Sequence, residues 1–297
     1  MLPYGAMIAF EQAHKQFVDH LSEKDRSPST VIAYKKDIQQ LLQHISNNFD
    51  KTHVHHINTD DIRSFMGSLE KENYTKKSIS RKLNSIKTFF RFLKINNLVV
   101  DDPSVLISHP KFDTPPPRIL TKTEYRALRD AAREDIRTYA IIELLLQTGI
   151  RIGELAEITM ADLTIDTEGE SSSLKIPASR TTLERTIPLN KAAAHAMQAY
   201  LKERPTTTYE NVFVTRTGNP LLVRNIRASI DRFYEHAGIE HAKVNDLRHT
   251  WIAHHIKEGT SLITISKMAG HRRLATTEKY LQYIDIQTAN GLNLEEL

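Results

Sequence analysis

The chain has 297 residues, of which 40% are hydrophobic and 26% are charged, and it contains no cysteine. These values are typical of a soluble globular protein of about two domains, and the lack of cysteine excludes disulfides, thiolate nucleophiles and cysteine-ligated metal. The formal net charge is only +4, so the chain as a whole is not a polycation. Without a long apolar run or a secretory leader, the sequence predicts a cytoplasmic protein that does not span a membrane.

The first hundred residues are predicted to be helical. Two helices within 7–47 are separated by the polar stretch SEKDRSPS, where Pro28 can be the first residue of the second helix. A third helix is expected at 60–71, with Thr59 or Asp61 as its cap. The histidines that precede this helix, His53, His55 and His56, are expected to lie in a surface loop, because no further ligand nearby completes a metal site.

Residues 78–94 are predicted to form a helix with an apolar side and a basic side. The apolar residues recur at helical spacing, and they are Ile79, Leu83, Ile86, Phe90 and Leu93. Between positions 71 and 94, eight Lys or Arg residues stand against one acid, Glu72. A charged stretch is most often a solvated face, but such faces usually mix both signs, whereas basic residues alone suit phosphates along a duplex. The residues expected to contact DNA are Lys77, Arg81, Lys82, Lys87 and Arg91.

Residues 101–118 contain five prolines and no apolar period, which predicts an interdomain linker. It would separate a helical domain, residues 1–100, from a second domain, residues 119–297. The second domain is predicted to be mostly helical, with helices at 122–133, 139–148, 191–203, 222–237, 246–258, 262–269 and 275–283. Three short strands, at 162–166, 173–178 and 184–189, predict a small antiparallel sheet within it.

Three motifs in the second domain suit chemistry on a phosphodiester. They are TGIRIGEL, which contains Arg151, VNDLRHT, which contains Arg248, and GHRRLATTEKY, which runs from a Gly-His pair to Tyr280. The planar fork of an arginine can bind two phosphate oxygens at once and neutralise charge that grows in a transition state. A tyrosine hydroxyl can attack the phosphorus and hold the DNA covalently, without water or metal.

In this order, the motifs resemble those of the tyrosine recombinases, the phage integrase family, and the nine residues from His271 to Tyr280 match the family's usual spacing. The resemblance implies a mainly α protein of two domains that clamp DNA. The first would be a helical core-binding (SAM-like) domain, and the second a mostly helical catalytic domain with a small antiparallel sheet. It also implies site-specific cleavage and rejoining of DNA through a 3′-phosphotyrosine, without ATP, metal or another cofactor.

The resemblance assigns roles to four residues of the motifs. Arg151 and Arg248 would bind the scissile phosphate, His271 would donate a hydrogen bond to it, and Tyr280 would attack it. Tyr283 is a competing nucleophile that the spacing disfavours. Because the pKa of a free tyrosine is about 10, the attack needs nearby arginines that favour phenolate or a base that accepts the proton.

Two positions depart from the family pattern. Asn245 stands where the family has a histidine, and an amide cannot act as an acid or base near neutral pH. Arg180 stands where the family has the lysine that resembles a general acid for the leaving 5′ oxygen, and arginine hardly releases a proton. Lys175 is the alternative for that role. His249, beside Arg248, is expected to be structural.

The resemblance also concerns partners. It implies double-stranded DNA with paired recombination sites and a homotetramer on that DNA, with accessory proteins possible. The tail at 281–297 offers Leu292, Leu294 and Leu297 for docking in a neighbouring copy, and a frayed tail is the alternative. Chain length favours a Xer-like or transposon-encoded resolvase over a phage integrase with an added arm-site domain.

Two other functions stay open at this point. One is a type IB topoisomerase or hairpin-forming resolvase, which would share the chemistry but not the exchange of partners. The other is a DNA-binding protein whose active site has decayed, a reading motivated by Asn245 and Arg180.

Overall fold

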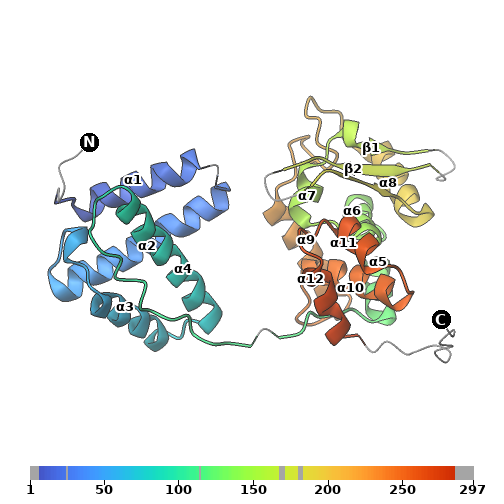
Figure 1. Cartoon of the computed structure of the whole chain (residues 1–297). Coiled ribbons are helices and arrows are strands. Elements are labelled where there is room, and N and C mark those ends of the chain that lie inside the picture. Colours follow the sequence, from blue (N-terminus) through green and yellow to red (C-terminus); the bar gives the residue numbers. More distant parts are fainter. Residues whose placement is uncertain (1–6, 25, 114, 167–170, 180–182, 285–297) are drawn as a thin grey trace, which may run out of the picture. The chain divides into compact units, whose positions relative to one another are not determined.

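A computed structural model describes residues 7–24, 26–113, 115–166, 171–179 and 183–284. The chain forms two compact units, residues 1–114 and 115–297 (Figure 1). The division falls within the stretch 101–118 that the sequence predicts as a linker. Within the described ranges, no helix is both long enough and apolar enough to cross a membrane.

The N-terminal unit contains four α-helices among its described residues. They are α1 (Phe10–Glu23), α2 (Pro28–Phe49), α3 (Thr59–Lys71) and α4 (Lys76–Ile95), with a short 3-10 helix, η1 (Val54–His56), before α3. Pro28 is the first residue of α2, as predicted, and the Ser27 side chain caps that helix by accepting from the N–H of Thr30. The cap of α3 is Asn58, and Asp61 completes a capping box with it. The expectation that Thr59 or Asp61 is the cap was therefore wrong by a few positions.

The core of the N-terminal unit is built around α4. The five residues of the predicted apolar stripe are all buried, and so are Phe89 and Phe92, which widen the stripe. Phe89 meets Phe17 of α1 edge to face, with ring centroids 5.2 Å apart. The apolar side of α4 therefore faces α1 and the rest of the core, and its basic side is left toward solvent.

Lys82 does not belong to that basic side. It is 4% exposed, and its ammonium group donates to the carboxylate of Asp37 at 2.9 Å and to the Gln40 side chain. Asp37, 2% exposed, also accepts from Arg81 and, at 2.8 Å, from Ser85. The prediction that Lys82 contacts DNA is therefore corrected, because its charge is used inside the core. Arg81 pairs with the same carboxylate but keeps a half-exposed side chain.

The C-terminal unit is mostly helical, as predicted. Its helices are α5 (Lys122–Ala132), α6 (Ile136–Thr148), α7 (Ile152–Glu157), α8 (Lys191–Glu203), α9 (Val223–His236), α10 (Val244–Lys257), α11 (Leu262–Ala269) and α12 (Ala275–Glu278), with 3-10 helices η2 (Met160–Asp162) and η3 (Lys279–Gln282). The single helix expected at 275–283 is instead α12 followed directly by η3. The predicted helix at 122–133 is present as α5, and Thr121 and Glu124 form a capping box at its start.

A three-stranded antiparallel sheet completes this unit. Its strands β1 (Leu163–Thr164), β2 (Ser173–Ile176) and β3 (Arg185–Pro188) lie in that order, with Leu174 opposite Ile187 and Ile176 opposite Arg185. Side chains alternate between the two faces of a strand. The buried residues Leu174, Ile176 and Ile187 therefore share the inner face with Arg185, while Lys175 lies on the outer face.

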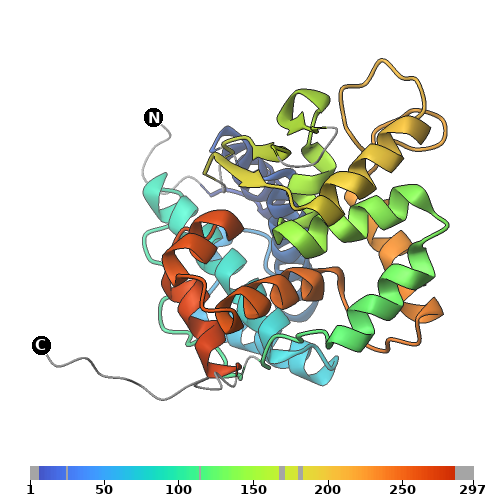
Figure 2. The ribbon, with the colours of Figure 1, turned by 90° about the vertical axis from the view of Figure 1, so that its right-hand side faces the viewer.

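The core of the C-terminal unit surrounds α6, which is apolar on nearly every side and contacts α5, α8, α9 and α10. A second, smaller apolar cluster includes Trp251 of α10, Ile265 of α11 and Tyr280 of η3. The helix α11 lies against α10, α12 contacts α11, and η3 contacts α10, and the orange-to-red segment that they form can be followed in Figures 1 and 2. This packing brings the C-terminal motifs beside the residues that follow α6.

The buried Asp37 cluster generates a stability prediction. In Asp37, burial by itself raises the carboxyl pKa, but hydrogen bonds from Arg81, Lys82 and Ser85 outweigh it and lower the pKa. In an Asp37→Ala variant, Lys82 keeps a buried charge without its carboxylate. We expect a loss of about 3–5 kcal/mol in the free energy of unfolding, measured by urea denaturation with circular dichroism.

The matched control is Arg63→Ala, which breaks the exposed pair between Arg63 and Asp60 in the same unit. An exposed pair contributes less than about 1 kcal/mol. Equal effects of the two substitutions would contradict a structural role for the buried cluster.

Candidate active site

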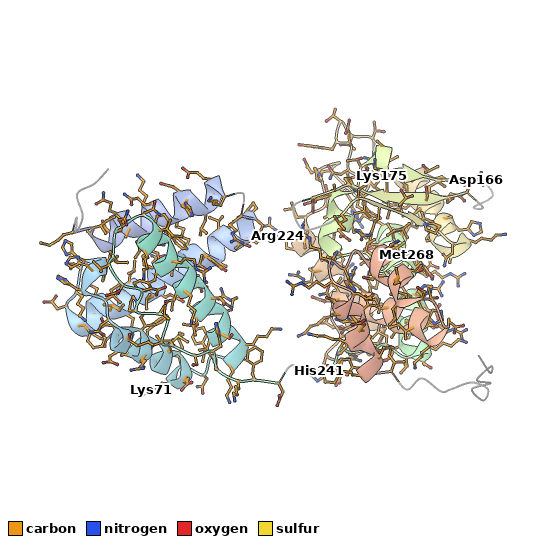
Figure 3. The ribbon with its side chains drawn as sticks, viewed as in Figure 1. Lys71, Asp166, Lys175, Arg224, His241 and Met268 are labelled. Atoms are coloured by element: carbon orange, nitrogen blue, oxygen red, sulfur yellow. The ribbon has the colours of Figure 1, made fainter. Side chains whose placement is uncertain are left out.

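Three arginines donate hydrogen bonds to three consecutive backbone carbonyls at the end of α11. The pairs are Arg185 Nε to Met268 at 2.7 Å, Arg248 Nη2 to Ala269 at 2.6 Å, and Arg151 Nη2 to Gly270 at 2.9 Å. The last carbonyls of a helix lack intrahelical partners and form the negative end of its dipole, so they attract cations. Met268 is labelled on this helix in Figure 3. Arg151 also donates to Ala269 at 3.4 Å, so Arg151 and Arg248 share one acceptor.

Local structure after α6 positions Arg151. Gly149 ends the helix in the left-handed region, with φ at +62°, and a Cβ there would lie 2.4 Å from the Trp251 ring. The chain then turns into extended backbone at Arg151, which is the N-cap residue of α7. Glu154 accepts from the Arg151 backbone N–H at 2.8 Å and from its guanidinium at 2.9 Å. The motif TGIRIGE therefore encodes a helix end, a turn and an arginine held by its own helix.

Arg248 comes from the middle of α10 and is 6% exposed. Besides Ala269, it donates to the carbonyl of Gly149. Burial, followed by repulsion from Arg151, lowers the pKa of Arg248 to about 10, and Glu154 partly offsets this. Arg248 is therefore a buried cation whose described partners are neutral carbonyls, an arrangement that an additional anion would stabilise.

Glu154 and Arg185 complete the cluster, and sequence reasoning missed both as site residues. Arg185 donates to the Glu154 carboxylate from Nη2 at 2.8 Å and from Nη1 at 3.2 Å, and both side chains are 8% exposed. Burial would raise the pKa of Glu154, but the bonds from Arg185 and from the Arg151 backbone lower it. One carboxylate thus stands among three guanidinium groups, which leaves the cluster with an excess of positive charge.

A signal for Arg185 was present in the strand pattern. Arg185 precedes the buried Ile187 by two residues, and the period of a strand places both on one face. An arginine on the inner face of a strand requires a buried partner. The sequence did not indicate which acid would supply it.

The turn after α11 positions His271. Gly270 has φ at +66°, and the His271 N–H donates to the Ser266 carbonyl at 2.9 Å, as in a Schellman motif. A Cβ at Gly270 would lie 2.7 Å from Arg185 Nη1 and 3.3 Å from Arg151 Nη1. Glycine is therefore needed both for the turn and for the close approach of two arginines.

His271 lies beside this cationic cluster. Its Nδ1 is 2.8 Å from the Thr277 hydroxyl. Burial, with repulsion from Arg248, Arg151 and Arg185, lowers the pKa of His271 to about 4. The imidazole is therefore neutral near pH 7 and can donate one hydrogen bond.

Tyr280 is 8% exposed, and its hydroxyl lies 2.6 Å from Nδ1 of His249. Burial raises the pKa of Tyr280, while the charge of Arg248 acts in the opposite direction. Tyr283, the competing candidate, is 39% exposed and shows no side-chain hydrogen bond within the described ranges. His249, expected to have only a structural role, therefore contacts the hydroxyl of the leading candidate for the nucleophile.

Two predicted positions, Asn245 and Lys175, lie apart from the cluster. Asn245 is exposed in the first turn of α10, where it lines a hollow together with Ile152, and its side chain makes no hydrogen bond to the described residues. Lys175, labelled in Figure 3, is exposed and lies 3.4 Å from Glu184. Its place on the outer face of the sheet directs it away from Arg185 and Glu154. Arg180 lies outside the described residues.

The predicted DNA-contacting residues of the N-terminal unit occupy one helix. Lys77, Arg81 and Arg91 are exposed on α4 and Lys87 is partly exposed, whereas Lys82 is buried, as described above. Lys77, Lys87 and Arg91 form no ion pair with any described residue. Among the described ranges, no three His, Cys, Asp or Glu side chains are grouped so that they could hold a metal ion.

Comparison with known families covers both units. Residues 118–285 match the model of the phage integrase family, and residues 14–97 match that of the phage integrase N-terminal SAM-like domain. The tyrosine recombinase XerC of Oceanobacillus iheyensis is 29% identical over 284 residues, which are 89% of each protein.

Solved structures share the fold. The site-specific recombinase XerH, in a post-cleavage complex with palindromic difH substrate, superimposes with a TM-score of 0.73 at 15% identity, covering 93% of this chain and 82% of that one. A lambda integrase tetramer bound to a Holliday junction superimposes with a TM-score of 0.70 at 18% identity, covering 90% of this chain and 78% of that one. The first family match alone spans more than half of the sequence, and the second accounts for most of the N-terminal unit. The chain therefore belongs to the phage integrase family and is a tyrosine-type site-specific DNA recombinase.

Proposed function

We propose that Tyr280 attacks a DNA phosphate that Arg151 and Arg248 hold, forming a 3′-phosphotyrosine and releasing a 5′ hydroxyl. The observation that carries this proposal is the carbonyl of Ala269, which accepts from both arginines and so fixes their guanidinium groups beside each other. A phosphate entering there meets donors that are already oriented, and such preorganised donors stabilise charge that grows in the transition state. Since the phosphotyrosine keeps the bond energy, the reaction needs neither ATP nor a metal.

Glu154 and Arg185 support the phosphate site without contacting the reacting atoms. Glu154 joins the Arg151 backbone and guanidinium to Arg185, and this pairing reduces repulsion among the three cations. His271, neutral near pH 7, donates a hydrogen bond to a non-bridging oxygen of the phosphate. Its neutral state avoids a further positive charge beside the three arginines.

Arg180 is the candidate for the group that stabilises the leaving 5′ oxygen. Its alternative, Lys175, is less suited, because its side chain is on the outer face of the sheet and pairs with Glu184. Because arginine rarely loses its proton, Arg180 would stabilise the oxyanion rather than protonate it. Asn245 could bond a phosphate oxygen but cannot exchange protons.

The exposed side of α4 is proposed as a DNA-binding face of the N-terminal unit. Lys77, Lys87 and Arg91 offer cations that no described acid neutralises, and Arg81 keeps a half-exposed guanidinium. Contacts of this kind position a protein on the backbone and carry little sequence information. Lys82 is left out, because Asp37 and Gln40 occupy its ammonium group.

We propose that four copies act on two paired DNA sites. The lambda integrase tetramer on a Holliday junction has the same fold, and exchange of strands between two sites requires two cleavages on each. The 5′ hydroxyl of one site would attack the phosphotyrosine of the other. The similarity to XerC over 89% of the chain favours a Xer-like or transposon-encoded resolvase, which would act in the cytoplasm, with accessory proteins as a further possibility.

One experiment decides whether Tyr280 or Tyr283 is the nucleophile. With a duplex that is nicked near the cleavage site, so that the short product diffuses away, wild-type protein should accumulate a covalent adduct on a denaturing gel. Tyr280→Phe should abolish this adduct, because it removes the attacking oxygen. Tyr283→Phe should retain it, because Tyr283 is an exposed residue and the hydroxyl that contacts His249 belongs to Tyr280.

An adduct formed by Tyr280→Phe would overturn the assignment of Tyr280 as the nucleophile. If the wild-type protein forms no adduct on a cognate site, the result favours a DNA-binding protein whose active site has decayed.

A plasmid with two sites distinguishes a recombinase from a type IB topoisomerase or hairpin-forming resolvase. Recombinant circles support exchange between sites, whereas relaxation alone or closed ends would contradict it.

The low pKa of His271 predicts how stability depends on pH. Folded protein binds a proton at His271 only near pH 4, whereas the unfolded chain binds one near pH 6.5. The contribution of His271 to the free energy of unfolding is therefore fully present above about pH 6.5, and it is lost as the pH falls toward 4. Its upper limit is about 3 kcal/mol, reduced by the partial exposure of the ring.

The measurement is urea unfolding followed by the fluorescence of Trp251, the only tryptophan, at several values of pH. His271→Gln should flatten the fall in stability between pH 6.5 and 4.5. The exposed His195 provides the control, since His195→Gln should keep the wild-type slope. Identical slopes for wild type and His271→Gln would contradict the buried, neutral state of this imidazole.

A further inference from the structure

The proposed chemistry lacks a proton acceptor for Tyr280. Attack on phosphorus requires the phenol to lose its proton, and burial makes this loss harder by raising the pKa of Tyr280. Asn245, at the position where the family pattern has a histidine, cannot accept a proton near neutral pH. A base must therefore come from another residue or from solvent, and Tyr280 as a residue is only 8% exposed.

His249 is one helical turn beyond Asn245 on α10. Residues four apart lie on the same side of a helix. The imidazole of His249 therefore lies on the same side of α10 as the amide of Asn245. Nδ1 of His249 lies 2.6 Å from the Tyr280 hydroxyl, within the distance that a general base requires. The two rings are 5.8 Å apart between centroids.

We propose that His249 is the general base of cleavage and the general acid of rejoining, in place of the group that Asn245 cannot supply. This assignment rests on the proposed role of Tyr280 as the nucleophile. As the bond between Tyr280 Oη and phosphorus forms, the phenolic proton moves to Nδ1 and the bond to the 5′ oxygen breaks with its electron pair. The departing oxygen takes its proton from solvent or from a donor on the leaving side. In rejoining, the 5′ hydroxyl releases its proton to solvent or to the group on the leaving side and bonds to phosphorus. The bond from phosphorus to Tyr280 Oη then breaks, and Nδ1 returns its proton to the departing phenolate.

The surroundings of His249 suit this exchange. Nδ1 can accept only in the tautomer with the ring proton on Nε2, and the ring must be neutral beforehand. Burial lowers the pKa of His249, and Arg248 lowers it further, against the opposing charge of Asp246. Among the described residues outside α10, Tyr280 and His271 also interact with the ring. An imidazolium beside Arg248 is disfavoured, which assists return of the proton, and Asp246 limits this penalty.

The test compares wild-type protein with His249→Gln, whose amide can still bond the phenol but cannot take its proton. Single-turnover adduct formation on the nicked duplex is measured from about pH 5.5 to pH 9. We expect His249→Gln to be slower by about 10²–10⁴-fold at pH 7. Its rate should rise with pH throughout, as the phenol ionises by itself, whereas the wild-type rate should level off once the imidazole is neutral. His254→Gln, which removes an exposed histidine from the same helix, is the control and should match the wild type.

A second variant, His249→Ala, distinguishes a role of His249 as general base from a purely structural role. His249→Ala should recover part of its rate when imidazole is added to the buffer, and the recovery should increase with the neutral imidazole concentration. Trp251 fluorescence and binding to the same duplex show whether each variant is folded. A folded His249→Gln variant with the wild-type rate and pH profile overturns the proposal. So does a rate loss with an unchanged pH profile that imidazole fails to restore in His249→Ala.

Failure of this inference differs from failure of the proposed function. If Tyr280→Phe forms no adduct and His249→Gln behaves as the wild type, Tyr280 remains the nucleophile and only the base is wrongly assigned. If Tyr280→Phe still forms an adduct, the nucleophile itself is wrong, and the role of His249 fails with it.

Discussion

The end of α11 is the feature on which the rest of the candidate site depends. A helix that stops at Gly270 leaves its last carbonyls without intrahelical partners, and three guanidinium groups donate to them. Three like charges would otherwise repel one another. The carbonyl dipoles and the carboxylate of Glu154 hold them together before any DNA is present. The positive charge that a phosphate requires is thus built into a helix terminus.

This arrangement also decides the state of the neighbouring groups. Positive charge and burial keep His271 neutral, and they lower the pKa of Arg248 to about 10. Tyr280 experiences the opposite balance, because burial raises its pKa more than Arg248 lowers it. In the proposed mechanism, Tyr280 therefore needs a proton acceptor, for which we propose His249, and the phosphate is bound by the arginines.

The sequence predicted much of this molecule because its signals are local. Pro28 begins α2 as predicted, and the apolar residues predicted on one side of α4 are all buried. The cap of α3 and the form of the last helix differ from the prediction by a few residues. The spacing of the motifs also identified Arg151 and Arg248, which do converge on one carbonyl. The assignment of catalytic roles to these residues stays a prediction.

What the sequence did not indicate are pairings between distant segments. Lys82 looked like one more cation of a basic helix, but Asp37, on another helix, draws it into the core. Arg185 lies within a predicted strand, and its partner Glu154 lies in a different motif. The contact between His249 and Tyr280 depends on how η3 packs against α10, and no periodicity in either segment encodes it. Charge and periodicity predict the helix or strand to which a residue belongs. The pairings at this site depend on which other helix or strand packs against it, and sequence patterns do not indicate that.

The central claim is that Arg151 and Arg248 form one phosphate site in line with Tyr280. The most direct measurement is a crystal structure of the protein on its DNA site, with vanadate joining the cleaved strand ends as a mimic of the transition state. The account predicts vanadium bonded to Tyr280 Oη, with its equatorial oxygens within hydrogen-bond distance of both guanidinium groups. Vanadate bound to another residue, or contacted by only one of the two arginines, would contradict it.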